Sequence, residues 1–512
     1  MLRSTVPSAG RVLVPVAFVA ADAVAFWLVR PDVPDLWAAR ARASAAAHGV
    51  GLTYWFSWFG GSTPGGYSVI TPLVSAVVGS EAVAAGAAVA IAAVVGLLVR
   101  GTRRPTAAAW VAAVGVVVNL WCGRVPFLLG GAFAVASLLM VRHRRSAPAA
   151  VLAALSVLAS PVSGGFLALA LSGVVLTPRL RDHRASALVS TGSALASLAV
   201  VAALFGNPGP EPFPPYLLAE TVAAIALMLL ASPSPHLRVT LVVSAVAALV
   251  VFAVPNGLGA NYARLALYCL PAAAVALSRR RLAVLAALVA PILVFEGLTS
   301  VSAAQSAGRP GSHASYYAVL AAELDTRPGL ADHRLELVST GWAAYAVLAG
   351  HAMLARGWET QSSRALADQL TSQDLDASGY RAWLDENAVG YVALNTGGST
   401  TTPEARLVAG GHLRFLRLVW SHGPWRLYAV RRPTPIVAAP ARVTAWSQAA
   451  IHVHVPRAGR TAVRVRWSRF LSASPTASAA PQAGRPTLAS GPGGWTTLTT
   501  SRPGTYVLEG RW

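Results

Sequence analysis

The placement of arginine between apolar stretches is the feature that most constrains how this chain folds. Between Met1 and Leu298, arginine clusters occur at every second junction between apolar runs. Fifteen arginines lie on this set of junctions, namely Arg3, Arg11, Arg100, Arg103, Arg104, Arg142, Arg144, Arg145, Arg179, Arg181, Arg184, Arg238, Arg279, Arg280 and Arg281. Short cytoplasmic loops of membrane proteins carry such an excess of Arg and Lys. The alternation therefore predicts a multi-pass membrane protein whose residues after Leu298 lie outside the cytoplasm.

The composition supports a membrane protein. Hydrophobic residues make up 55% of the 512 residues and charged residues only 12%, and the mean hydropathy is +0.54, above the usual range of soluble domains. The net charge of +21 comes from arginine alone, because the chain has no lysine. Since these arginines follow the loop pattern, they do not indicate a nucleic-acid partner. Two cysteines, Cys122 and Cys269, form neither a disulfide framework nor a CxxC motif.

Apolar runs long enough to cross a bilayer as helices define the expected spans. They cover residues 11–29, 81–99, 106–121, 124–141, 186–205, 216–231, 239–254, 262–278 and 282–299. Both flanks of residues 149–176 are arginine-rich, so this stretch is expected to form two short helices that meet at a broken turn over residues 160–165. The sequence thus predicts about eleven transmembrane helices in the plasma membrane, with a cytoplasmic N-terminus. Small residues near the end of the first run leave open a cleaved signal peptide.

The longest loop of the membrane part, residues 30–80, is expected on the outer side and is rich in polar and aromatic residues. Asp32 and Asp35 open it, and Tyr54, Trp55 and Trp58 follow an alanine-rich helical stretch. Clustered aromatic residues suit either anchoring at the membrane interface or a platform for sugar rings. Tyr67 then leads into a short amphipathic helix before the second span.

This loop resembles that of the GT-C superfamily of membrane glycosyltransferases, as found in actinobacterial multi-pass membrane proteins. The likeness rests on an early acidic residue, a Gly-aromatic stretch and a Tyr-x-x-x-x-Pro-Leu entry into the next helix. The segments 123–127, 160–166 and 259–265 also resemble members of this group, some of which are labelled 6-pyruvoyl-tetrahydropterin synthase-related. The resemblance implies a polyprenyl-phosphate sugar donor and an acidic residue that acts as a base or orients the acceptor. Asp35 matches that position best and Asp32 second, although the adjacent acidic pair of many members is absent.

Arg124 and Arg264 are exceptions to the arginine alternation, because each falls at an outer junction; Arg30, Arg40 and Arg42 do so within the long loop. A guanidinium at the membrane edge can hold a phosphate through two parallel hydrogen bonds. Asn261 lies just before Arg264 and is a further candidate for substrate binding. The alternative is that both arginines extend to lipid headgroups.

Three acidic residues fall at membrane depth: Asp22, Glu220 and Glu296. Ionisable groups inside a membrane usually mark a function. Each of these lies within reach of a membrane end, so a cavity-facing or interface-facing position is expected rather than a buried proton relay.

The chain after residue 299 is expected to fold outside the membrane. Residues 300–432 mix helices and strands, with helices expected over 316–325, 342–353, 359–370 and 379–387 and four strands, which indicates an α/β domain. Residues 433–512 alternate in period two, as in Ile451, Val453 and Val455 against His452 and His454, which indicates a β-sandwich. The histidines follow no metal or catalytic motif, and no metal site is predicted. Arg356, Trp358 and Glu359 could line a saccharide surface or serve ordinary structural roles.

We interpret the chain as a polytopic α-helical membrane protein of the GT-C kind over residues 1–299, with an extracytoplasmic α/β domain and a β-sandwich. The hypothesis is a glycosyltransferase that moves a sugar from a polyprenyl-phosphate donor to a cell-envelope glycan or lipid. Asp35 or Asp32 would be catalytic, and the substrate would be bound by Arg124, Arg264, Asn261, Tyr54, Trp55, Trp58 and Tyr67. No cofactor is required by the residues, although a divalent cation remains open. A transporter, or a catalytically silent scaffold that binds envelope glycans, are the alternatives.

Overall fold

The computed structural model describes residues 10–58, 63–206, 209–232, 234–357, 364–476 and 485–511. The chain divides into two compact units. The helical unit comprises Met1–Ala43 and Gly66–Gly308, and the C-terminal unit comprises Ser44–Gly65 and Arg309–Trp512. The boundary expected near residue 300 therefore falls at Gly308, and residues 44–65 of the long loop belong to the C-terminal unit.

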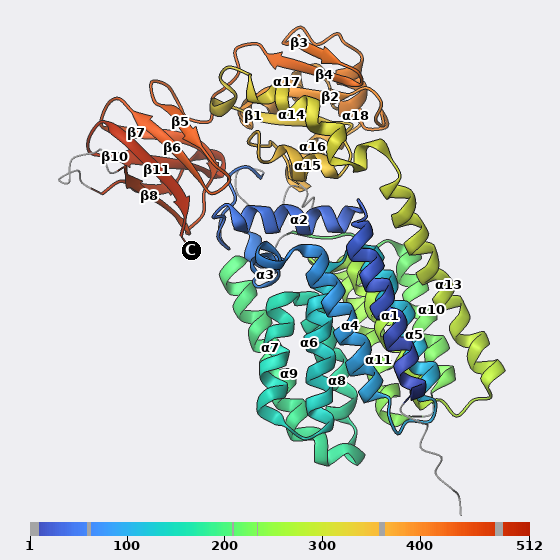
Figure 1. Cartoon of the computed structure of the whole chain (residues 1–512). Helices are drawn as coiled ribbons and strands as arrows, with labels where there is room; N and C mark the ends of the chain where they lie inside the picture. The colour runs from blue at the N-terminus through green and yellow to red at the C-terminus, as the bar shows by residue number, and fades with distance from the viewer. Residues whose placement is uncertain are drawn as a thin grey trace, which may run out of the picture. The chain divides into compact units, whose positions relative to one another are not determined.

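The helical unit is a bundle of apolar helices (Figure 1). Its elements are α1 (Gly10–Val29), α2 (Pro34–Ala47, which continues into the C-terminal unit), α3 (Thr71–Val78), α4 (Ser80–Leu98), α5 (Pro105–Trp121), α6 (Val125–Arg142), α7 (Ser146–Ala159), α8 (Pro161–Leu176), η2 (Pro178–Leu180), α9 (Arg181–Phe205), α10 (Pro215–Ala231), α11 (Pro235–Ala253), η3 (Gly259–Tyr262), η4 (Leu265–Cys269), α12 (Leu270–Leu277) and α13 (Leu282–Ala307).

Among the described residues, six helices are long and apolar enough to cross a membrane. A seventh candidate is the pair formed by residues 13–29 and α2, which is bent by 68°. Four shorter apolar helices, α5, α7, α8 and α10, complete the set. The chain is thus a membrane protein with several apolar helices, whereas the count of eleven spans and the orientation across the membrane stay predictions.

The expected break in the stretch 149–176 lies at Ser160, between α7 and α8. Pro161 opens α8, and the Ser160 side chain accepts a hydrogen bond from the backbone N–H of Ser163, which caps the new helix. Small residues let the helices pack closely here: the Ser156 hydroxyl donates to the carbonyl oxygen of Gly130 on α6 at 2.8 Å. Close packing of small residues is the usual basis of helix association in membranes.

The C-terminal unit contains an α/β domain with a four-stranded mixed sheet in the order β1-β2-β4-β3 (Figure 1). The strands are β1 (Arg334–Val338), β2 (Val389–Asn395), β3 (Leu416–His422) and β4 (Trp425–Val430), and only the β1/β2 pair is parallel. The helices are α14 (Ala318–Asp325), α15 (Ala343–Leu348), α16 (Arg364–Thr371), α17 (Ala377–Glu386) and α18 (Pro403–Ala409).

The prediction of a helix over residues 342–353 is wrong for the second half of that range. Helix α15 ends at Leu348, and Leu354 instead forms parallel bridges with Leu335 of β1 and with Trp58. This pairing depends on a residue almost three hundred positions away, so local periodicity could not reveal it.

The last part of the C-terminal unit is a β-sandwich of two antiparallel sheets, ordered β5-β6-β11-β8 and β7-β10-β9 (Figure 1). The strands are β5 (Arg442–Trp446), β6 (Ala450–Val455), β7 (Gly459–Arg466), β8 (Leu471–Pro475), β9 (Thr487–Ser490), β10 (Trp495–Thr500) and β11 (Gly504–Gly510). On β6 the apolar residues Ile451, Val453 and Val455 are buried and His452 and His454 face outward, as the alternation predicts.

Residues 50–58 form part of the core of this same unit. Tyr54 and Phe56 pack among the buried residues of the sandwich, and the Tyr54 hydroxyl donates to the carbonyl oxygen of Arg466 at 2.7 Å. Trp55 and Trp58 stack with ring centroids 4.4 Å apart and are 1% and 3% exposed. The C-terminal unit therefore depends on a segment that precedes most of the membrane helices in the sequence.

A buried ion cluster occupies the α/β domain. The Arg356 side chain donates to Glu336 of β1 and to Glu404 of α18, each at 2.9 Å. One guanidinium cannot neutralise two carboxylates, and burial raises the pKa of Glu404 to about 8. Arg356 therefore has a structural role, and Trp358 and Glu359, considered with it for a saccharide surface, lie outside the described residues.

Trp58→Ala should destabilise the C-terminal unit by about 3–5 kcal/mol, because it removes a buried indole and leaves a cavity. The effect can be measured by heating the purified protein and detecting unfolding of the C-terminal unit through its susceptibility to proteolysis. Trp467, whose side chain is 44% exposed, provides the control: Trp467→Ala should change stability by less than about 0.5 kcal/mol. Equal effects of the two substitutions would contradict the burial of residues 50–58.

The Glu404 carboxyl should make the C-terminal unit less stable at alkaline pH. Its pKa is raised in the folded state, so folding favours the protonated form. The resulting stability is complete below the unfolded pKa of 4.5 and is lost as pH rises through about 8, with a slope of at most about 1.4 kcal/mol per pH unit. Denaturant unfolding between pH 5 and pH 9 should show this slope in the wild type and in Glu386→Gln, a change at an exposed position. In Glu404→Gln the slope should be smaller, and an unchanged slope would contradict the assignment.

Candidate functional site

Helix α2 carries the first residue of the candidate site. The helix begins at Pro34, which suits the first helical position, and Asp35 lies in its first turn. A carboxylate is favourable there because the N-terminus of a helix carries partial positive charge. The Asp35 side chain is 38% exposed.

The two exceptional arginines also lie at helix starts. Arg124 directly precedes α6 and Arg264 directly precedes η4, a π-helical turn. A cation at a helix N-terminus is opposed by the helix dipole, so helix preference does not explain either residue. Single π-helical turns within α-helices often occur at functional sites.

The structure brings Asp35, Arg124 and Arg264 together, and we call them the acid-arginine cluster. The Asp35 Oδ2 atom lies 3.6 Å from Arg124 Nε and 3.9 Å from Arg264 Nη2. The two arginine side chains are only 13% and 19% exposed. Two guanidiniums thus lie against one carboxylate, which is an arrangement suited to binding an anion.

Arg124 is held from two sides but keeps an unsatisfied donor. Its Nη1 donates to the side-chain oxygen of Asn119 at 2.9 Å, and its guanidinium lies over the Tyr268 ring at 5.3 Å. Its Nε atom is buried and has no hydrogen-bond partner among the described residues. A buried donor without an acceptor is costly, and this atom lies 3.6 Å from Asp35 Oδ2.

Tyr67 and Arg42 adjoin the cluster. The Arg42 guanidinium lies 4.2 Å from the centre of the Tyr67 ring, and Tyr67 is within electrostatic range of Asp35, Arg124 and Arg264. Tyr67 is 45% exposed, whereas Arg42 is buried. Asn119 and Tyr268 were not expected from the sequence, because nothing in their local pattern differs from that of ordinary helix residues. Arg42 falls at an outer junction of the arginine alternation but was not proposed as a site residue.

Asp32, the second candidate for catalysis, pairs with a different arginine. It accepts a hydrogen bond from Arg40 at 2.9 Å, and Arg40 also donates to Glu81 of α4 at 2.8 Å. These contacts attach α2 to the start of α4. Asp32 is therefore part of the support for α2, and Asp35 is the carboxylate that meets the exceptional arginines.

The other predicted substrate-binding residues are not part of the cluster. Tyr54, Trp55 and Trp58 are buried in the core of the C-terminal unit and leave no ring face free for a sugar. Because these side chains are buried inside the protein, they also do not serve as the interfacial anchors considered in the sequence analysis. Asn261 lies on η3, the turn that ends two residues before Arg264.

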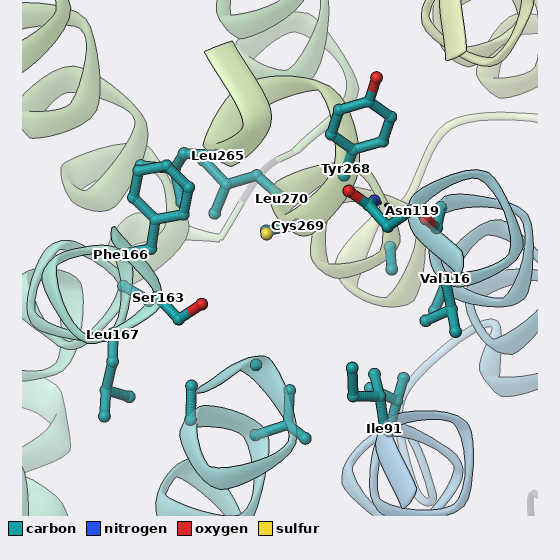
Figure 2. Close-up of a pocket in the computed structure, with 18 of the residues that line it drawn as sticks. Ile91, Val116, Asn119, Ser163, Phe166, Leu167, Leu265, Tyr268, Cys269 and Leu270 are labelled. Atoms are coloured by element: carbon teal, nitrogen blue, oxygen red, sulfur yellow. Dashed lines mark hydrogen bonds between the residues drawn. The ribbon is translucent and has the colours of Figure 1, made fainter. Parts of the chain in front are cut away.

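An apolar cavity of about 210 Å³ lies within the helical unit. Three of its lining residues contact the arginines: Asn119 and Tyr268 contact Arg124, and the Phe127 ring lies 5.4 Å from the Arg264 guanidinium. Figure 2 shows Tyr268 and Asn119 on one side of the cavity and Phe166, Ser163 and Leu167 on the other, with Cys269 between them. The charged cluster and the apolar cavity therefore share a wall.

The acidic residues at membrane depth do not belong to the acid-arginine cluster, although Glu296 lies within electrostatic range of Cys269, which lines the cavity. Asp22 on α1 accepts a hydrogen bond from the Trp121 indole at 2.9 Å. Glu296 on α13 is 1% exposed, and one of its oxygens, like one of Glu220, has no hydrogen-bond partner among the described residues. Within the described part of the chain, no three His, Cys, Asp or Glu residues come together as a metal site.

Comparisons with known proteins identify no family. No protein-family model matches the chain, and no curated protein matches it. Among solved structures, the chain is similar to the crystal structure of an oligosaccharyltransferase from Archaeoglobus fulgidus with a tethered acceptor peptide. The TM-score is 0.43 at 13% identity, over 84% of this chain and 76% of the other. A similarity at this level does not assign a fold or an activity.

Gly123 allows Arg124 to reach α2. Its φ is +74°, and a Cβ atom at this position would lie 2.6 Å from the backbone nitrogen of Leu36, next to Asp35. Gly123→Ala should therefore destabilise the helical unit by about 1–3 kcal/mol through backbone strain and displacement of α2. Thermal unfolding in detergent measures this, with Gly86→Ala as the control because a Cβ atom there meets nothing within 4 Å. A Gly123→Ala protein as stable as Gly86→Ala would refute this packing.

Proposed function

We propose that this protein is a membrane glycosyltransferase of the GT-C kind. It would transfer a sugar from a polyprenyl-phosphate donor to a cell-envelope acceptor on the outer side of the membrane. The observation that carries the proposal is the shared wall between the acid-arginine cluster and the apolar cavity. A lipid phosphate complements both features, because its anionic group is joined directly to an apolar chain.

The arginines would bind the donor phosphate. Transfer breaks the bond between the sugar carbon and the phosphate oxygen, so the phosphodiester leaves as a phosphate monoester with more negative charge. Arg124 and Arg264 would stabilise this developing charge, and interactions that strengthen in the transition state accelerate a reaction. The buried, unsatisfied Nε atom of Arg124 provides a donor for a phosphate oxygen.

Asp35 would accept the proton of the acceptor hydroxyl as its oxygen attacks the sugar carbon. The carboxylate is the most exposed member of the cluster, at 38%, so an acceptor can reach it. The proton neutralises Asp35 at the time when the leaving phosphate gains charge. Both guanidiniums then interact with the phosphate alone.

The cavity would take the first part of the lipid chain. A dry protein cavity of about 150 Å³ can bind benzene, so 210 Å³ suits an apolar group of about one or two isoprene units. The rest of the chain would extend into the bilayer.

Asp35→Asn should lower sugar transfer at least about a hundredfold, because it removes the base but keeps the size of the side chain. The measurement is transfer of labelled sugar from a synthetic polyprenyl-phosphate donor into the envelope fraction of membranes that contain the protein. Asp182→Asn, which alters an exposed ion pair with Arg144, is the control and should keep full activity. Full activity of Asp35→Asn would refute the proposal, and lipid-phosphate binding by the wild type without transfer would favour the silent scaffold.

A further inference from the structure

One oxygen atom occupies the point where the two guanidiniums of the cluster converge. Arg124 Nε and Arg264 Nη2 both have the same Asp35 atom, Oδ2, as their carboxylate neighbour, at 3.6 and 3.9 Å. An anion that contacts both nitrogens through one oxygen places that oxygen near this same point. Asp35 therefore stands where an oxygen of a bound phosphate would lie.

Asp35 offsets one of the two positive charges of the arginines without satisfying their donors. Hydrogen bonds between a guanidinium and a carboxylate are usually 2.7–2.9 Å long, and both separations here are clearly longer. The Nε atom of Arg124 is also buried without a hydrogen-bond partner among the described residues. The carboxylate is thus loosely held, and another anion with better geometry can replace it.

Helix α2 itself is more firmly attached than the Asp35 side chain. Arg40 joins Asp32, the carbonyl oxygen of Arg30 and Glu81 at 2.8–3.1 Å, which attaches the first turns of α2 to α4. The Asp35 side chain is 38% exposed and has space on its solvent side. Exchange of anions therefore needs a rotation of one side chain rather than a movement of the helix.

We propose that Asp35 is an internal counter-ion that closes the empty site and is displaced when the donor phosphate binds. This inference rests on the proposed function and adds an order to it. The carboxylate becomes free to accept a proton from the acceptor only after the phosphate has taken its place between the arginines. The donor therefore binds first, and an acceptor that arrives at the empty site meets a carboxylate still paired with Arg124 and Arg264.

If Asp35 is displaced, its substitution should strengthen phosphate binding, whereas substitution of an ordinary binding residue weakens it. Removing the internal competitor should tighten the binding of a phosphate, so Asp35→Asn should bind farnesyl phosphate about three- to tenfold more tightly than the wild type does. The measurement is isothermal titration of the full-length protein in detergent micelles. Farnesol, which has the same chain without the phosphate, should bind both proteins equally.

Asp32→Asn is the matched control. It removes a negative charge three residues away in the sequence, but Asp32 pairs with Arg40 and does not stand between the two arginines. It should therefore leave the affinity for farnesyl phosphate nearly unchanged. Equal tightening in both variants would indicate a general effect of charge and would overturn the displacement.

Two arginine variants separate the counter-ion role of Asp35 from the phosphate site itself. Arg124→Gln and Arg264→Gln should each weaken farnesyl phosphate binding. If they do, and Asp35→Asn binds no more tightly than the wild type, the counter-ion role is wrong while the phosphate site stands. If neither arginine variant changes the affinity, the phosphate site itself is wrong.

Discussion

The candidate site depends on a carboxylate that lies against two buried, positively charged guanidiniums in an apolar helical bundle. Buried positive charges require a negative partner, and Asp35 is the carboxylate that Arg124 and Arg264 share. Several features of the fold serve this contact. Helix α2 is bent by 68° from the preceding helix, Arg40 attaches it to α4, and Gly123 allows the turn before α6 to approach it.

Topology rules made part of this site predictable from the sequence. The alternation of arginine clusters isolates Arg124 and Arg264 because they fall at the wrong junctions, and the structure places both beside Asp35. A residue that breaks a strong general rule is informative without knowledge of the fold. The same holds for the sandwich strand β6, where alternation alone indicates which residues are buried.

Other features depend on contacts between distant segments and could not be predicted. Trp55 and Trp58 belong to an aromatic run that local rules assign to an interface or a sugar platform, yet they pack inside the C-terminal unit. Asn119 and Tyr268 support Arg124 only because α5 and η4 pack together. The resemblance of the long loop ranks Asp35 above Asp32, but the contact of Asp32 with Arg40 and that of Asp35 with Arg124 and Arg264 could not be predicted.

The central claim is that a lipid phosphate binds at the acid-arginine cluster with its chain in the apolar cavity. Photo-crosslinking tests this most directly, with a polyprenyl phosphate that carries a diazirine on its first isoprene unit and mass spectrometry to locate the adducts. The account predicts adducts on cavity residues such as Phe166 and Leu265, which disappear when Arg124 and Arg264 are both changed to Gln. Adducts confined to exposed apolar residues of the helical unit such as Val222 and Leu230, or adducts unaffected by the double change, would contradict it.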